Sequence, residues 1–415
     1  MLNASFYHHI IGNFCCKQNY HYVNTHTCSI ENLFVHDSPN TITRKTTPVN
    51  RQIIGLNHSA TTMMGQGIIE RYKEFLPINE NTPIISLNEG NTPLIFSKNI
   101  TNHISGDFNL YIKFEGLNPT ASFKDRGMTL AVSKALENGA KAIVCASTGN
   151  TSASAAAYAA RAGIKCVVLI PEGKIAYGKM AQALIHGAIT LEIRGNFDDA
   201  LLLVRELGKR EDFEIVNSIN PFRIQGQKTG AFEICDSLET APDMHFLPVG
   251  NAGNITSYWM GYNEYRKLGI IKSLPQMMGW QAQGAAPIVR GHAIKKPETI
   301  ASAIRIGNPA SWQLANDAIK ESEGLIDSVT DEELLDAQRM LARMEGIFVE
   351  PASATGIAGL LKSNNNGQIP SGATVVVTVT GHGLKDPEIA VENSKVRSVV
   401  INPDISSVLN TLEIT

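Results

Sequence analysis

Short apolar segments alternate with longer amphipathic segments from Met63 onward, and this alternation limits the fold more than any other feature of the chain. The short segments are rich in Val, Ile and Leu, as buried strands are, and the segments between them have the apolar spacing of helices. Strands separated by helices of this length form βαβ units, which place the strands parallel in a sheet. We therefore expect an α/β fold with mostly parallel strands.

The pattern places the individual elements along the chain. Helices are expected at 127–136, 152–162, 179–185, 198–208, 225–238 and 255–268. Strands are expected at 142–146, 166–170, 190–193, 214–216, 245–249 and 373–380. Ligands of open α/β sheets collect beyond the carboxyl ends of the strands, so the loops that follow these strands are the first places to search for a site.

The composition excludes several classes of protein. A hydrophobic share of 43% supports a substantial core and is too high for a disordered chain. With 36 basic and 39 acidic side chains the net charge is −3, so nucleic acid is not an expected partner. The best candidate for a membrane helix, Ser152 to Pro171, is interrupted by Arg161 and Lys165. Six Cys in 415 residues fit a reducing compartment, and we expect a soluble, cytoplasmic protein without membrane contact.

Residues 1–62 differ from the rest of the chain. They contain only two acidic residues, Glu31 and Asp37, and show no sustained helical or strand period. They also hold an irregular set of His and Cys: His8, His9, Cys15, Cys16, His21, His26, Cys28, His36 and His58. This spacing matches no usual zinc pattern, so we expect no metal site. We interpret residues 1–62 as a disordered tail, or as sequence upstream of a true start at Met63 or Met64.

Two glycine-containing loops follow expected strands and lead into expected helices. The first covers 147–152, before an alanine-rich helix whose unpaired amides could hold an anion such as a carboxylate. The second covers 248–254, where small residues with successive free N–H groups could hold a phosphate. Neither loop has the spacing of a dinucleotide fingerprint or a P-loop, which argues against an NAD-binding dehydrogenase. Taken alone, each loop is more often an ordinary glycine turn.

A third element, Asn118–Gly127, contains a lysine near a helix start. Pro119 ends the preceding segment, and the helix at 127–136 follows, so Lys124 is expected beside Phe123 and the positive end of the helix dipole. This environment disfavours the ammonium and favours a neutral, nucleophilic amine. A single lysine is usually a solvated surface charge. The combination with the two loops makes Lys124 a candidate nucleophile.

From about Gly65 to Pro403 the sequence resembles the threonine synthases, a family of fold-type-II, tryptophan-synthase-β-like enzymes that depend on pyridoxal 5'-phosphate. Five segments carry the resemblance, and together they are highly specific: Glu89–Leu94, Asn118–Gly127, Ser147–Ser154, Gly250–Asn254 and Thr380–Asp386. The resemblance implies a catalytic unit of residues 63–415 made of two α/β lobes, with the cofactor between them. The smaller lobe would be an insertion of roughly 133–240, and the protein would be a homodimer.

The resemblance also implies how the cofactor is bound. Lys124 would form the Schiff base, Asn150 would hydrogen-bond the ring hydroxyl oxygen, and Thr380 would face the pyridine nitrogen. The cofactor phosphate would lie on the backbone N–H groups of Gly250, Asn251, Ala252, Gly253 and Asn254. A neutral hydroxyl at Thr380 cannot enforce a protonated pyridinium as an aspartate would, so the ring would be a weaker electron sink, suited to eliminations at the β and γ positions.

The implied reaction converts O-phospho-L-homoserine and water to L-threonine and phosphate, with Lys124 as the proton shuttle. The substrate carboxylate would lie on the loop that contains Thr148, Thr151 and Ser152. The substrate phosphate would be bound by Ser218 and Arg223, in the segment after the expected strand 214–216, since a dianionic leaving group needs cations and hydroxyl donors. The alternative for Arg223 is a surface salt bridge.

Two rival functions fit part of the pattern. Serine/threonine dehydratases share the Ser-x-Lys-x-Arg spacing of Ser122, Lys124 and Arg126. They differ from this chain in two ways: they usually carry an apolar residue at the position of Asp125, and their phosphate loop contains four consecutive glycines. Cysteine synthases differ similarly at that loop. A non-catalytic binding protein of the same fold would be favoured by loss of the lysine or the phosphate loop, and both are present.

Overall fold

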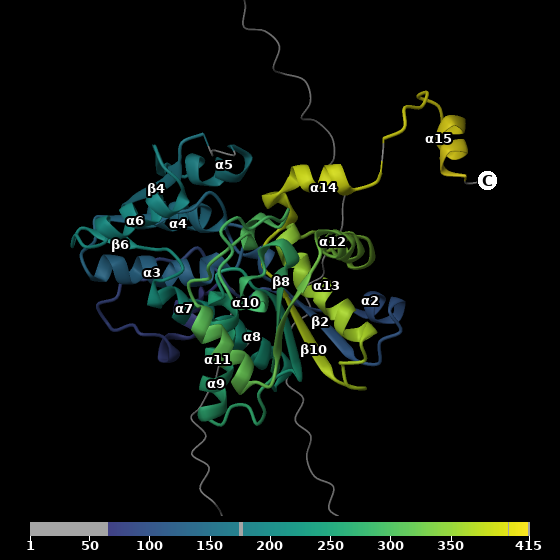
Figure 1. Cartoon of the computed structure of the whole chain (residues 1–415), viewed down its shortest axis with the longest axis horizontal. Helices are drawn as coiled ribbons and strands as arrows, with labels where there is room; N and C mark the ends of the chain where they lie inside the picture. Colours follow the sequence, from purple (N-terminus) through teal and green to yellow (C-terminus); the bar gives the residue numbers. More distant parts are fainter. Residues whose placement is uncertain (1–64, 174–176, 397, 414–415) are drawn as a thin grey trace, which may run out of the picture. The chain divides into compact units, whose positions relative to one another are not determined.

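The computed structural model describes residues 65–173, 177–396 and 398–413 (Figure 1). The expectations for residues 1–62, a disordered tail without a metal site, lie outside these ranges. Within them the chain forms two separate sheets flanked by helices.

The larger sheet has six strands in the order β1-β2-β10-β7-β8-β9. Only β1 is antiparallel, and the other neighbours are parallel. The bounds are Leu94–Phe96 (β1), Asn109–Phe114 (β2), Met244–Pro248 (β7), Gln276–Ala282 (β8), Leu325–Val329 (β9) and Thr374–Val379 (β10). Strand β10 lies between β2 and β7, as Figure 1 shows for β2 and β10, so its carboxyl end is at the middle of the sheet edge. The expected strands at 245–249 and 373–380 are confirmed within one residue at each end.

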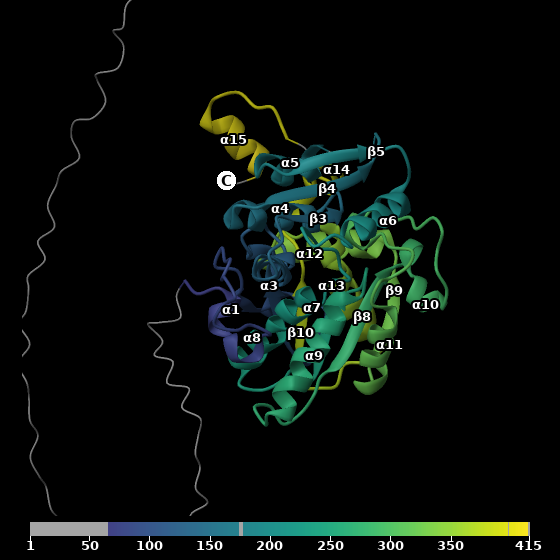
Figure 2. The ribbon, with the colours of Figure 1, turned by 90° about the vertical axis from the view of Figure 1, so that its left-hand side faces the viewer.

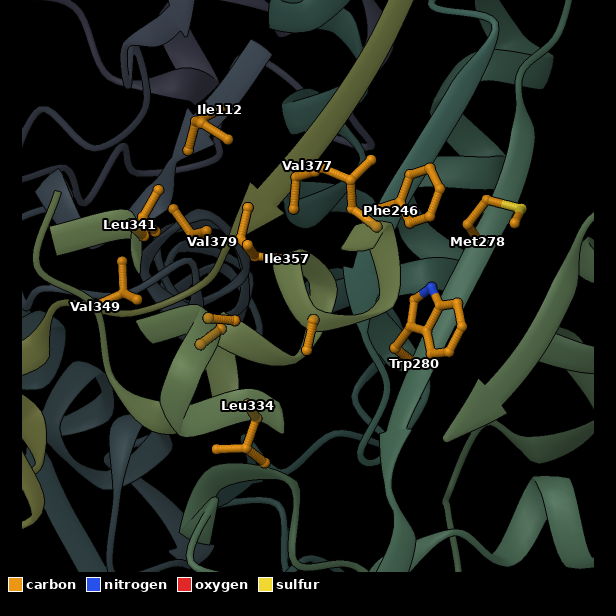
Figure 3. Packing of buried hydrophobic residues seen from close by; sticks show 14 of the residues in the cluster. Ile112, Phe246, Met278, Trp280, Leu334, Leu341, Val349, Ile357, Val377 and Val379 are labelled. Atoms are coloured by element: carbon orange, nitrogen blue, oxygen red, sulfur yellow. The ribbon is translucent and has the colours of Figure 1, made fainter. Parts of the chain in front are cut away.

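Successive side chains of β10 point to opposite faces of this sheet, and both faces are covered by helices. Val375, Val377 and Val379 pack in one apolar cluster with α12 (Asp331–Glu345) and α13 (Pro351–Asn365), whereas Val376 packs in the cluster on the opposite face. That face carries α8 (Thr229–Leu238), α9 (Gly253–Lys267) and α11 (Trp312–Glu321). Figure 3 shows Val377 and Val379 beside Ile357 of α13, with Trp280 of β8 in the same layer. A strand buried on both faces is a continuous apolar run, as β10 is.

The second sheet has four parallel strands in the order β5-β4-β3-β6. They are Ala142–Ala146 (β3), Lys165–Pro171 (β4), Ile189–Ile193 (β5) and Phe213–Ile215 (β6), and Figure 2 shows β3, β4 and β5 side by side. On one face Ile143 and Cys145 pack against α3 (Lys124–Glu137) and α4 (Asn150–Ala162). On the other, Val144 and Ala146 pack against α6 (Phe197–Leu207). Because successive side chains of β3 point to opposite faces of the sheet, helices pack on both faces, and this part of the chain has three layers.

The helix expected at 225–238 is wrong in its extent, because the structure has two helices there, α7 (Pro221–Gln227) and α8. Asn220 caps α7 by accepting from two backbone N–H groups, which starts that helix four residues earlier than expected. The Thr229 hydroxyl donates to the Gly226 carbonyl at the junction. A Cβ at Gly226 would lie 2.1 Å from the Arg126 carbonyl oxygen, so α7 crosses α3 at this glycine. The crossing of α3 and α7 therefore accompanies a division into two helices where the sequence pattern predicts one.

The other described helices are short or peripheral. They are α1 (Ile68–Arg71), α2 (Lys98–His103), α5 (Tyr177–Ile185), α10 (Pro287–Arg290), α14 (Pro387–Asn393) and α15 (Ile405–Leu412), with 3₁₀ turns at Lys73–Phe75, Glu115–Leu117, Gln283–Ala285, Ser302–Ile304 and Gly383–Lys385. None of the helices in the described ranges is both long and apolar enough to span a bilayer.

Candidate active site

Lys124 is the first residue of α3, as its position near a helix start predicts. Its Nζ lies 3.9 Å from the centroid of the Phe123 ring. The pKa of Lys124 is lowered to about 7, mainly by burial and also by the positive charge of Arg223, while Glu350 opposes both by favouring the ammonium. At neutral pH a large fraction of this amine is therefore unprotonated, which is the form that attacks a carbonyl.

A buried ionic cluster holds the first turn of α3 in place. The Arg126 guanidinium lies 2.6 Å from a Glu115 oxygen and 2.7 Å from a Glu233 oxygen, and Lys113 lies 2.7 Å from Glu233. All four side chains are almost fully buried. Removing one member would leave an uncompensated charge in the interior, so the cluster ties α3 to β2 and α8 through groups that depend on one another. The sequence pattern around Arg126 did not reveal this role.

Asp125 joins the lysine segment to the second sheet. Its carboxylate accepts from the Thr120 amide and hydroxyl, both at 2.6 Å, and from the Ser154 hydroxyl of α4 at 2.5 Å. Burial raises the pKa of Asp125 to about 6, and the hydrogen bonds from Ser154 and Thr120 partly offset this rise. Between Thr120 and Asp125, Ala121 has φ of 63°, so the loop before Lys124 turns through a left-handed residue.

Thr380 lies next to the lysine segment through the backbone. The Phe123 N–H donates to the Thr380 carbonyl at 2.9 Å, so the residue before Lys124 is attached to the residue that follows β10. The Thr380 hydroxyl is buried and lies 2.9 Å from the hydroxyl of Ser353 on α13. Two elements more than 250 residues apart in the chain are thereby brought together, as a site containing Lys124 and Thr380 requires.

Asn150, the first residue of α4, contacts a residue that the sequence reasoning missed. Its side-chain amide donates to both oxygens of Glu350, at 3.1 and 3.0 Å. Glu350 precedes α13 and is 2% exposed. Burial raises the pKa of this carboxyl, while the hydrogen bond from Asn150 lowers it. A Glu-Pro pair at a helix start is the only feature of the sequence that could have drawn attention to Glu350.

The loop Gly250–Asn254 turns from β7 into α9 with free amides. Ala252 has φ of 65°, and α9 begins at Gly253. In the described part of the chain, residues 250–254 donate no backbone hydrogen bond, whereas Val249 donates to Trp280. Both side-chain amide atoms of Asn254 are buried and have no described partner. A left-handed residue followed by a helix start directs successive N–H groups into one concavity, which suits a phosphate.

Arg223 is fully buried in α7 rather than placed in a surface salt bridge. Its Nη1 donates to the Val216 carbonyl at 3.1 Å, and its Nε has no partner among the residues described. Burial lowers the pKa of Arg223 to about 10. A buried guanidinium with an unused donor, and with no ion pair to a carboxylate of the described residues, is suited to an anionic ligand.

Asn217 joins the two segments that contain the other expected substrate residues. The Asn217 amide accepts from the Ala146 N–H at 3.1 Å and donates to the Ala146 carbonyl at 3.0 Å. This double hydrogen bond joins the segment of Ser218 to the end of β3, where the loop with Thr148 and Thr151 begins. Side chains of Ser218, Thr148 and Thr151 are half-buried.

Ser152 differs from the other residues of its loop. It is fully buried, and its hydroxyl donates to the Gly149 carbonyl at 2.8 Å inside the first turn of α4. The hydroxyl is thus engaged within its own helix. At this position the backbone N–H, rather than the side chain, is the group suited to a ligand.

Lys385 gives the site a further cation for which the sequence analysis had no role. It follows the Thr380–Gly383 turn, and its Nζ hydrogen-bonds Gln182 of α5. Burial lowers the pKa of Lys385, and Glu350, Asp125 and Asp386 raise it, in that order. Glu350 therefore acts on the amines of both Lys385 and Lys124. No group of three or more His, Cys, Asp or Glu in the described ranges could hold a metal ion.

Comparison with known proteins gives one consistent family. The model of the pyridoxal-phosphate dependent enzymes matches residues 85–381. The threonine synthase of a Bacillus species is 56% identical over 350 residues, covering 84% of this chain and 97% of that protein. The threonine synthase of Mycobacterium tuberculosis is 56% identical over 349 residues, 83% of this chain and 96% of that protein. The threonine synthase of Methanocaldococcus jannaschii is 54% identical over 334 residues, covering 78% of this chain and 82% of that protein.

Solved structures agree on the fold. A threonine deaminase from T.th. has a TM-score of 0.62 at 23% identity, covering 76% of this chain and 98% of that one. Maize serine racemase has a TM-score of 0.64 at 21% identity, covering 76% and 95%. These likenesses confirm the expected α/β architecture of fold-type-II enzymes. With a family model matched over most of the sequence and relatives more than half identical over most of their own length, this chain belongs to the threonine synthases, a family of pyridoxal-phosphate-dependent lyases.

Proposed function

We propose that this enzyme converts O-phospho-L-homoserine and water to L-threonine and inorganic phosphate, the last step of threonine biosynthesis. The observation that carries the proposal is the environment of Lys124. One buried amine with a pKa near 7 lies beside the buried guanidinium of Arg223, whose Nε has no partner among the described residues, and both residues belong to the crossing of α3 and α7. An amine for the cofactor and a cation for a second phosphate are what this substrate requires.

The residues present fit pyridoxal phosphate. Lys124 would hold it covalently, the free amides of Gly250–Asn254 would hold its phosphate, and the Thr380 hydroxyl would face its pyridine nitrogen. The Asn150 side-chain amide would donate a hydrogen bond to the ring oxygen, either in place of its present hydrogen bonds to Glu350 or in addition to them. A Cβ at Gly250 would lie 3.0 Å from Ile304 Cα, so the loop backbone is packed closely from behind. The bound cofactor supplies an electron sink for carbanions at the substrate carbons.

The substrate would be held by groups on three elements. The half-buried loop containing Thr148 and Thr151, with the N–H of Ser152, supplies donors for the carboxylate. Arg223 and Ser218 supply a cation and a hydroxyl for the substrate phosphate, where negative charge develops as it leaves. Lys124 Nζ, once free, can carry a proton between neighbouring substrate carbons, because its pKa near 7 allows it to accept and donate at neutral pH.

The organisation around this site is also a proposal. We infer a smaller lobe of roughly 133–240 that moves to close over the substrate and excludes water until it is needed. The hydrogen bond between Lys385 and Gln182 of α5 supports a closing contact across the site. Superposed structures with and without substrate should differ by a relative movement of this lobe. Their coincidence would refute the inference.

The homodimer and the cytoplasmic location rest on the family resemblance and the composition. A net charge of −3 gives no support to nucleic acid as a partner. Sedimentation of the purified protein would test the dimer directly.

The test of the proposed reaction measures two products at once. Purified protein loaded with pyridoxal phosphate should release phosphate and form threonine in equal amounts from O-phosphohomoserine. The visible absorbance of the lysine-bound cofactor should be lost in Lys124→Ala. If 2-ketobutyrate formation from threonine dominates instead, the enzyme is a dehydratase. If neither activity appears although the cofactor binds, the protein is a non-catalytic binding protein.

A further inference from the structure

Ser353 makes an unusual number of hydrogen bonds at the end of β10. Its Oγ accepts from the backbone N–H of Thr380 at 2.9 Å and from that of Gly381 at 2.8 Å. It also lies 2.9 Å from Thr380 Oγ1, in a contact where either hydroxyl could donate by distance alone. Ser353 is fully buried in the first turn of α13.

Counting protons decides which hydroxyl donates. A serine hydroxyl has two acceptor lone pairs and one proton. The two backbone N–H groups occupy both lone pairs of Ser353 Oγ, so the contact with Thr380 is satisfied only if Ser353 donates. Thr380 Oγ1 then receives that proton and keeps its own hydroxyl proton for another acceptor. The direction of this bond is therefore set by two amides that cannot reverse their polarity.

The Gly381 carbonyl competes for the Ser353 proton, at 3.2 Å. This oxygen already accepts from the Glu350 N–H at 3.0 Å. If Ser353 donated to it, the contact with Thr380 would need a third lone pair on Ser353 Oγ. The shorter contact to Thr380 is the one that leaves every group satisfied.

We propose that Ser353 is a positioning residue that fixes the Thr380 hydroxyl as a hydrogen-bond donor toward the pyridine nitrogen of the cofactor. This inference rests on the proposed function, because it needs pyridoxal phosphate against Thr380. It gives a reason why the ring nitrogen would stay unprotonated: a Thr380 hydroxyl that already accepts from Ser353 would offer its own proton, and the nitrogen would be the acceptor. A Thr380 free to rotate could accept from a protonated ring instead.

The ring nitrogen itself reports the effect. The holoenzyme is prepared with cofactor labelled with ¹⁵N in the ring, and the nitrogen chemical shift is recorded by NMR. The wild type should show a neutral, hydrogen-bonded nitrogen. Ser353→Ala should move the signal away from that value, in the direction of Thr380→Val, and should lower kcat about tenfold with KM little changed, the effect of one hydrogen bond. Thr380→Ser keeps the hydroxyl and should retain the wild-type shift.

A matched control lies on the same helix. Ser363 is also fully buried in α13, but its hydroxyl has no partner among the described residues, so Ser363→Ala should leave the nitrogen shift unchanged. A wild-type shift in Ser353→Ala, with cofactor bound, would overturn the inference and leave the proposed function intact. Absence of any lysine-bound cofactor in the wild type would instead remove the proposed function.

A second measurement avoids the variant altogether, in case Ser353→Ala does not fold. Neutron diffraction from crystals of the wild-type holoenzyme locates the deuterium between Ser353 and Thr380. We expect it on Ser353 Oγ, with the Thr380 deuterium directed toward the ring. Deuterium on Thr380 Oγ1 pointing at Ser353 would contradict the inference.

Discussion

Asn150 and Glu350 form a buried pair that joins α4, beside the second sheet, to α13, beside the first, with the amide donating to both carboxylate oxygens at 3.1 and 3.0 Å. The carboxylate also lies close enough to Lys124 to favour its ammonium. One side chain thus influences both a residue expected to contact the cofactor and the lysine expected to carry it. Its removal should be visible in the titration of that lysine.

Glu350→Gln should make Lys124 more reactive at low pH. The substitution keeps an acceptor for Asn150 and removes the negative charge that raises the pKa of Lys124, so this pKa should fall below about 7. The measurement is the pH dependence of amine modification in the protein without cofactor. Its midpoint should move down by about one pH unit. Glu392→Gln, at an exposed position, is the control and should not move it.

Arg223→Gln should have the opposite effect on the same titration and a separate effect on the substrate. The positive charge of Arg223 lowers the pKa of Lys124, so its loss should raise that pKa. If Arg223 also binds the substrate phosphate, kcat/KM for O-phosphohomoserine should fall about 10- to 100-fold, the effect of a charged hydrogen bond. Arg210→Gln, in an exposed ion pair with Asp212, should change neither quantity. A raised lysine pKa with unchanged kcat/KM would place the substrate phosphate elsewhere.

Asp125→Asn should change how stability depends on pH. Burial raises the pKa of Asp125 to about 6 from its ordinary 3.8, so between these values the folded protein holds a proton that the unfolded chain releases. Unfolding is then favoured as pH rises through this window, by about 3 kcal/mol at most. Thermal unfolding at pH 4, 5, 6 and 7 should show a smaller fall for Asp125→Asn than for the wild type.

The same variant should also be less stable than the wild type at pH 4, where Asp125 is protonated and its ionisation does not destabilise the wild type. Asn has one acceptor oxygen where the carboxyl group of Asp125 has two, which accept from Thr120 twice and from Ser154. An unsatisfied buried donor costs about 1–3 kcal/mol. Parallel pH profiles for the two proteins would contradict the raised pKa.

Gly359→Ala should destabilise the core although alanine is the better helix former. A Cβ at this position would lie 2.1 Å from Trp280 Cδ2, in the middle of a buried ring that has no room to move aside. The gain in helix propensity is about 1 kcal/mol, whereas overpacking a tight core costs about 1–3 kcal/mol or more. The melting temperature should therefore fall. Trp280→Leu in the Gly359→Ala background should recover part of the loss, and strictly additive effects would show that the two residues do not collide.

Much of the fold followed from local pattern. Strand β3 was placed at 142–146, and its bounds are Ala142–Ala146, because a fully buried parallel strand is a run of apolar residues bounded by turn residues. The helix break at Lys228 was missed for the opposite reason. It depends on α3 crossing α7 at Gly226, a contact between segments about 100 residues apart that leaves no period in the sequence.

The site shows the same division. Lys124 was found because its place beside Phe123 and near a helix start was combined with the two glycine loops and with the family resemblance of its segment. Glu350, Arg126 and Ser353 were missed because their partners come from other elements: Asn150, Glu233 and Thr380. The sequence around a glutamate or serine at an apolar helix start does not indicate which residue will be its hydrogen-bond partner. The role of a buried polar group becomes clear only when its hydrogen-bond or ion-pair partner is known.

The alternation of strands and helices between residues 124 and 268, the glycine loops after β3 and β7, and the lysine at the start of α3 were determined by the amino-acid sequence alone, because each depends on residues close in the chain. Tertiary structure decided which charges face Lys124, which hydroxyl donates at the end of β10, and where Arg223 is buried. These properties arise from desolvation and from hydrogen-bond partners brought together by packing, and neither can be read from neighbours along the chain.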